Sequence, residues 1–156
     1  MRQNFSIELP EGLDEPHKTL REFFVHNGYS VVKDNDDWPL SLKRGKAGAG
    51  WWSSNMTDLL TELNIERNGE TLDVTYHVDT TGQLMSDEDR AFWPSEVRAA
   101  ERYLHGKGEL VDLRDGEAKR VKKLEREHLR IGMWGAAIVF VFVFGFVLVV
   151  NRFSLL

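Results

Sequence analysis

The residues best suited to chemistry lie in one glycine-rich basic loop. Residues 44–50 read RGKAGAG. A glycine-rich loop can bind phosphate when its backbone N–H groups point inward at the start of a helix, often with a lysine followed by serine or threonine. Here alanine follows Lys46. We therefore expect a mobile loop between two strands, with phosphate or nucleotide binding as the alternative.

A tryptophan pair, Trp51 and Trp52, follows this loop directly. Adjacent residues of a strand point to opposite faces, so the pattern predicts one indole in the core and the other in solvent. An exposed tryptophan beside a basic loop is typical of a partner contact or of an anchor at a membrane surface. We expect Trp51 and Trp52 to form a partner contact, with simple packing as the alternative.

The other reactive side chains do not form a catalytic or metal-binding pattern. The chain has no cysteine, and its five histidines lack the H-x-x-x-H spacing of a metal site. The acidic run Asp34–Asp37 lacks the central glycine and the closing glutamate of a calcium loop. The acids of residues 87–89 follow Ser86, a pattern that predicts a capped helix start. We expect a protein that is not an enzyme and that has no metal and no cofactor.

The strongest signal is the stretch 131–150, IGMWGAAIVFVFVFGFVLVV, which contains no charged residue. Twenty helical residues span about 30 Å, the thickness of the hydrocarbon core of a bilayer. The stretch therefore predicts a transmembrane helix. The N-terminus, MRQNFSIELP, lacks the apolar core of a signal peptide, and six residues follow the stretch. We expect a single-pass, tail-anchored protein.

The flanking charges predict the orientation of this helix. Residues 114–130 hold seven Lys or Arg and four Asp or Glu, whereas the far side has only Arg152. The positive-inside rule then places the N-terminal head in the cytoplasm, and we favour a bacterial inner or intracytoplasmic membrane. Residues 1–113 carry a net charge of −9, which argues against nucleic acid as a partner. We expect contacts with lipid headgroups from Lys119, Arg120, Lys122, Lys123, Arg126, Arg130 and Trp134.

Small residues near the start of the stretch indicate helix packing. Gly132 and Ala136 form a small-xxx-small pair, and Gly135 adds a second gap on an adjacent side. Phe140 and Phe144 share one face of the helix. We expect these residues to pack against other integral membrane subunits; the alternatives are phenylalanines that face lipid or that contact a pigment or quinone.

Residues 1–108 show the patterns of a small α+β head. Phe5, Ile7 and Leu9 alternate with polar residues, which predicts a strand. A helix is expected between Asp14, its cap, and Gly28, its stop. Asn68-Gly69 between two alternating runs predicts a tight hairpin in which both turn residues have positive φ. The other expected elements are strands over 29–33 and 38–43, with the latter at an edge or starting at its proline, and a helix from Ser86 to Gly106 that Pro94 kinks or restarts.

The predicted order is strand, helix, four strands, helix, which indicates a mostly antiparallel sheet with its helices on one face. This order resembles a shortened helix-grip domain, in which a curved sheet wraps a long C-terminal helix. The large apolar residues over 72–78 favour a filled core over a ligand cavity. Beyond the head we expect a charged amphipathic stalk over 109–130, the transmembrane helix over 131–150 and a short tail, 151–156, on the far side.

Two functions fit these expectations. The first is a non-catalytic accessory or assembly subunit of a larger membrane complex, such as a photosynthetic or respiratory one, whose span packs on neighbouring helices while the head braces the cytoplasmic face. The second is a membrane-tethered domain of helix-grip-like shape that binds a lipid or a small molecule. The lipid bilayer is a partner in both.

Overall fold

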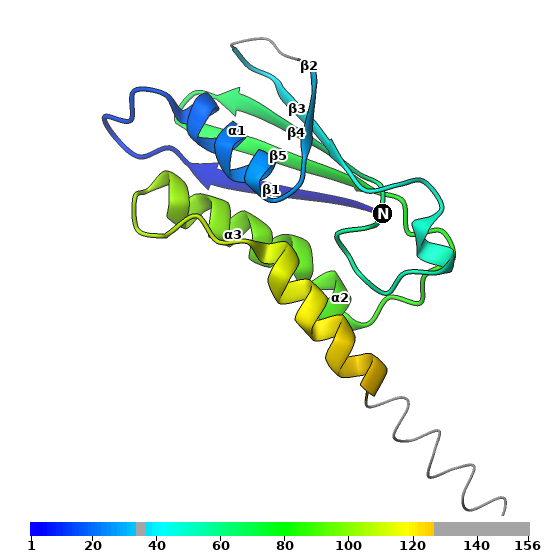
Figure 1. The fold of residues 1–156 in the computed structure, drawn as a ribbon. Coiled ribbons are helices and arrows are strands. Elements are labelled where there is room, and N and C mark those ends of the chain that lie inside the picture. The colour runs from blue at the N-terminus through cyan, green and yellow to red at the C-terminus, as the bar shows by residue number, and fades with distance from the viewer. Residues whose placement is uncertain (34–36, 127–156) are drawn as a thin grey trace, which may run out of the picture. The chain divides into compact units, whose positions relative to one another are not determined.

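The computed structural model describes residues 1–33 and 37–126. One compact unit, Met1–Ala118, contains a five-stranded antiparallel sheet with α1 and α3 packed on one face (Figure 1). The predicted α+β head with an antiparallel sheet is therefore confirmed. Its elements in chain order are β1 (Arg2–Glu8), α1 (Pro16–His26), β2 (Ser30–Lys33), β3 (Leu40–Arg44), the 3₁₀ turn η1 (Ala49–Trp51), β4 (Thr61–Asn68), β5 (Thr71–Val78), α2 (Asp87–Arg90) and α3 (Phe92–Leu104).

The sheet has the strand order β1-β5-β4-β3-β2, so the first strand pairs with the last. The alternation expected for β5 is confirmed: Leu72, Val74, Tyr76 and Val78 are all buried. They belong to the same hydrophobic core as the buried apolar residues of β4, α1 and α3. The third strand begins directly after Pro39 and is not an edge strand, because β2 and β4 pair on either side of it.

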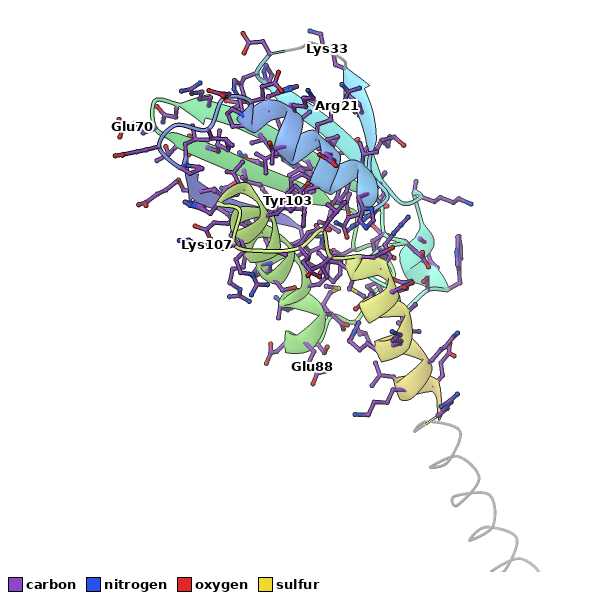
Figure 2. All side chains as sticks on the ribbon, turned by 60° about the vertical axis from the view of Figure 1, so that its left-hand side comes forward. Arg21, Lys33, Glu70, Glu88, Tyr103 and Lys107 are labelled. Atoms are coloured by element: carbon purple, nitrogen blue, oxygen red, sulfur yellow. The ribbon has the colours of Figure 1, made fainter. Side chains whose placement is uncertain are left out.

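Side chains fill the space between the helices and the sheet (Figure 2). Trp93 of α3, Phe23 and Phe24 of α1 and Tyr76 of β5 are each less than 2 % exposed. Charged side chains such as Glu70, Glu88 and Lys107 lie at the periphery of the same view. The large side chains expected to fill the core are therefore buried there.

The β4–β5 hairpin differs in one detail from the prediction. Asn68 is the last residue of β4 and pairs with Thr71, so Gly69 and Glu70 form the two-residue turn. Gly69 has φ 65°, and no other residue type has positive φ within the described ranges. A turn with glycine first needs positive φ at that position alone, which explains why Asn68 can stay in extended backbone.

The helix starts also differ from each other. Asp14 does not cap α1: the N-cap is Glu15, which makes no side-chain capping bond, and Pro16 begins the helix. Ser86, by contrast, forms a full capping box with Asp89 at the start of α2. The single helix predicted after Ser86 is divided at Ala91 into α2 and α3. Pro94 therefore lies in the first turn of α3, where a backbone N–H would have no hydrogen-bond acceptor within the helix.

The segment after α3 returns along the head. Leu110 and Leu113 pack against the core, and Leu113 N–H donates to Asn27 Oδ1 at 2.9 Å. The carboxylate of Glu117 is buried and accepts the Met56 N–H at 3.1 Å. The compact unit thus includes this segment as far as Ala118.

Residues 113–126 are helical. In the part of the chain that is described, we find no helix with the length and apolar character needed to cross a bilayer. The transmembrane helix expected over 131–150 and the tail over 151–156 lie outside that part.

Candidate interaction site on the loop after β3

The loop after β3 packs tightly against the rest of the head. Gly45 has φ 78°, and a side chain there would collide with the carbonyl oxygen of Leu59. Lys46 N–H donates to the Asp58 carbonyl oxygen at 2.9 Å, and Lys46 also forms a parallel bridge with Leu59. The sequence predicts a mobile loop, whereas these contacts hold the loop against the head. The glycine at position 45 allows the two backbone segments to approach closely.

Three backbone N–H groups of this loop donate hydrogen bonds within the protein. Those of Lys46 and Ala49 donate to the carbonyl oxygens of Asp58 and Lys46, and that of Gly48 donates to Asp79 Oδ2 at 3.3 Å. A phosphate cradle of the backbone type needs such groups free and convergent. These three groups are therefore not free to bind an anion.

Trp51 and Trp52 are both exposed, at 68% and 77%, so the prediction that one of them enters the core is wrong. The reason is local. Gly48 has φ 72° and turns the chain into the 3₁₀ turn η1, in which neighbouring residues do not alternate between two faces as they do in a strand. Each indole rests on a glycine: Trp51 lies against Gly82, and the Trp52 ring lies over Gly48.

A second loop, residues 79–85, supports the tryptophan loop. A side chain at Gly50 would collide with the Thr81 carbonyl oxygen, and Gln83 Nε2 donates to the Ser53 carbonyl oxygen. Hydrogen bonds from the Thr81 side chain and N–H, and from the Gly48 N–H, lower the pKa of the Asp79 carboxyl group. Leu84, which follows Gln83, is 98% exposed. We call Trp51 and Trp52 the apolar patch.

A buried ion pair, which was not predicted from the sequence, lies beneath the start of this loop. Arg44 Nη1 is 2.7 Å from Glu96 Oε1 of α3, and the two side chains are 3% and 0% exposed. The hydroxyl of Tyr29 donates to Glu96 Oε2 at 2.9 Å, and Arg44 Nη1 also donates to the Asn27 carbonyl oxygen at 3.2 Å. The guanidinium carbon is 4.2 Å from the centre of the Tyr29 ring. The pair therefore ties β3 to both long helices.

The electrostatics of the pair follow from burial. Burial is the largest single influence and lowers the pKa of Arg44, but the charges of Glu96, Tyr29 and Tyr76 and the hydrogen bond to Glu96 together raise it. The pKa values of Tyr29 and Tyr76 are raised well above the usual value, first by burial and then by the charge of Glu96. One signal of the pair was available in the sequence: Glu96 interrupts the apolar face of the helix, between Phe92 and Ala100.

A cavity of about 570 Å³ opens beside the same loop. Its cationic lining comes from Arg44, Lys46 and Arg114, and Trp52 forms part of its wall. Arg114 is held by Asp112 through two hydrogen bonds, Nε–Oδ1 at 3.1 Å and Nη2–Oδ2 at 2.9 Å. The remaining lining residues are Gly28, Gly45, Ala47, Ala49, Ser53, Thr57 and Asp58.

The other predicted site residues fall into two groups. In the second unit, which begins at Lys119, the side chains of Lys119, Lys122, Lys123 and Arg126 are exposed and that of Arg120 is half-buried. Within residues 1–33 and 37–126, no cluster of His, Asp or Glu could hold a metal ion. The predicted headgroup contacts Arg130 and Trp134, and the predicted packing residues Gly132, Gly135, Ala136, Phe140 and Phe144, lie outside the described residues.

Comparisons with known proteins give no assignment: no protein-family model matches the chain, and no curated protein or solved structure shows significant similarity to it.

Proposed function

We propose that the protein is a non-catalytic, single-span accessory or assembly subunit of a larger membrane complex. In this proposal residues 131–150 anchor the chain and pack on neighbouring helices, while the head lies on the cytoplasmic side and contacts another subunit through the apolar patch. The observation that carries the proposal is the exposure of two adjacent tryptophans on a tightly packed loop.

The energetics of the patch favour a contact surface. Covering the exposed parts of Trp51 and Trp52 would remove roughly 250 Å² of apolar surface from water, which contributes about 6 kcal/mol before the entropy of association is subtracted. Because the loop is already packed by its glycines, binding would not need to order it. A membrane anchor would raise the effective concentration of head and partner further.

The filled interior supports this function over the ligand-binding alternative. A helix-grip cavity needs space between the sheet and the long helix, and here Trp93, Tyr76 and Phe24 occupy that region with less than 2% exposure. Single residues that dominate a protein interface are enriched in tryptophan, which matches the composition of the patch.

The test is co-purification of the full chain from membranes in mild non-ionic detergent, followed by identification of the partners. We expect a complex with the wild-type chain and its loss in a Trp51→Ala/Trp52→Ala variant, since each truncation should weaken the contact about 30-fold. The matched control is Val25→Ala/Val32→Ala, which trims two exposed apolar residues elsewhere on the head. A wild-type chain that elutes as a monomer would refute the proposal, and a complex that survives the tryptophan variant would refute the role of the patch.

The anchor has separate tests. Replacing Gly132 and Ala136 with leucine should weaken association and leave membrane insertion intact, because bulky side chains keep neighbouring helices apart. Protease added to sealed vesicles with the cytoplasmic side outward should digest the head. Full protection of the head would contradict the proposed orientation.

A further inference from the structure

Three cationic side chains and one acidic side chain line the cavity beside the tryptophan loop. Its volume of about 570 Å³ lies within the usual range of small-molecule sites. Three cationic side chains line it, from β3, from the loop after β3 and from the segment after α3, and Asp58 is the acidic side chain among its lining residues. The Asp58 carboxylate accepts a hydrogen bond from the Ser53 hydroxyl at 2.6 Å.

Arg44 supplies a fixed charge at the base of the cavity. Its Nη1 is used by Glu96 and by the Asn27 carbonyl oxygen, whereas Nε and Nη2 are buried and have no hydrogen-bond partner within the described residues. The guanidinium carbon lies over the rings of Tyr29 and Phe92, at 4.2 and 5.3 Å from their centres. Unpartnered guanidinium donors are unusual in a protein interior, where nearly all buried polar groups are paired.

Arg114 approaches the same cavity from the other side. Asp112 binds its Nε and Nη2, which leaves Nη1 out of the ion pair. The side chain lies over Gly28, so closely that a Cβ there would be 3.1 Å from Arg114 Cδ and 3.3 Å from Nη1. The hydrogen bond and the charge of Asp112 raise the pKa of Arg114, and the positive charge of Arg44 opposes that rise.

Lys46 completes the cationic lining. Its ammonium group is exposed and has no ion pair within residues 1–33 and 37–126. Three cations on separate segments that converge on one concave space suit an anion with several oxygens, and Arg and Lys are the side chains that proteins use for phosphate groups. The Trp52 ring, at the wall, offers an apolar surface to whatever the anion is attached to.

We propose that this cavity binds a phosphoryl group, with Lys46 and Arg114 donating hydrogen bonds to its oxygens and Arg44 providing the charge beneath it. The group belongs either to a small phosphate ester or to the headgroup of an anionic phospholipid. Recognition in this proposal rests on these three side chains. The site shares Trp52 with the apolar patch, but its charged residues Lys46 and Arg114 are not part of the patch.

The experiment uses the full chain in non-ionic detergent at constant ionic strength, with binding measured by calorimetry. One arm titrates inorganic phosphate and glycerol 3-phosphate. The other arm titrates detergent micelles that contain phosphatidylglycerol, against micelles that contain phosphatidylcholine. The variants are Lys46→Gln and Arg114→Gln, and the matched control is Lys43→Gln, which removes the same charge from an exposed residue of β3 that does not line the cavity.

We expect saturable binding in at least one arm, weakened about fivefold or more by Lys46→Gln and by Arg114→Gln and less than about twofold by Lys43→Gln. Binding in the first arm would identify a soluble phosphate ester as the ligand class, and binding of phosphatidylglycerol micelles alone would identify a lipid headgroup. No saturable binding in either arm would overturn the proposal. Equal weakening by all three variants would also overturn it, because it would indicate a general charge effect. Circular dichroism of each variant, compared with wild type, checks that the head stays folded.

Discussion

The buried Arg44–Glu96 pair allows the stability of the head to be tested with a single change. Glu96→Gln removes the negative charge but keeps nearly the same shape, so Arg44 would remain charged in an interior where it is 3% exposed. Breaking one side of a buried ion pair costs about 3–5 kcal/mol, a large part of the 5–15 kcal/mol that stabilises a typical domain. For a compact unit of this size we expect the melting temperature to fall by roughly 10–20 °C.

The assay is urea and thermal unfolding of the full chain, followed by circular dichroism and tryptophan fluorescence. The double variant Arg44→Met/Glu96→Leu is measured for comparison. Replacing both charges of a buried ion pair with apolar groups often leaves the free energy of unfolding nearly unchanged. We therefore expect this double variant to be more stable than Glu96→Gln. Glu15→Gln serves as a surface control, since its ion pair with Lys18 is exposed to solvent. The reasoning would be refuted if Glu96→Gln lost less than about 1 kcal/mol, or if the double variant were as unstable as the single one.

Three further predictions concern stability. Ser86→Ala should destabilise the head by about 1 kcal/mol through loss of the capping box, measured as a lower urea midpoint with an unchanged slope. Gly50→Ala should destabilise the head by about 1–3 kcal/mol, because the new methyl group would collide with a backbone oxygen. Gly116→Ala is the control: it adds a methyl group in open space on a helix and should be neutral or stabilising. Equal effects of the two variants in thermal unfolding would contradict the packing described for the loop. The pKa values of Tyr29 and Tyr76 are raised in the folded head, so folding keeps both phenols protonated. Their contribution to the free energy of unfolding is complete below about pH 10 and is lost as the pH rises toward the folded-state pKa values. A urea midpoint that is unchanged up to about pH 11 would contradict this prediction.

Local sequence patterns predicted the parts of the fold that depend on local chemistry. The alternation in β5 indicated its buried face, and Ser86 followed three residues later by an acid indicated the helix start. The Asn68-Gly69 pair indicated the position of the hairpin, but the observed turn lies one residue later, at Gly69 and Glu70. This turn needs positive φ only at its first residue, the glycine. These elements are encoded within a few residues of each other, which is why the sequence alone reveals them.

The candidate sites depend on contacts between segments that are distant in the chain. These contacts were therefore harder to predict from the sequence than the helices and strands. Trp51 and Trp52 were expected to alternate as in a strand, but Gly48 turns the backbone before them. Arg44 and Glu96 are 52 positions apart, and only the interruption of an apolar helix face hinted at their pairing. Lys46 and Arg114 of the cavity likewise lie on segments far apart in the chain, so no spacing rule could bring them together.

The pairing of β1 with β5 has a consequence for the order in which the head folds. Arg2 lies opposite His77, and the ammonium group of Met1 donates to the Val78 carbonyl oxygen at 2.7 Å. The β4–β5 hairpin can form early, because its two strands are adjacent in the chain, whereas β1 must wait until Val78 has been synthesised. Until β1 has paired with it, β5 has one unpaired edge, which is open to association with other nascent chains. A bulky fusion at the amino terminus should slow this closing step, so reporter groups are better attached elsewhere.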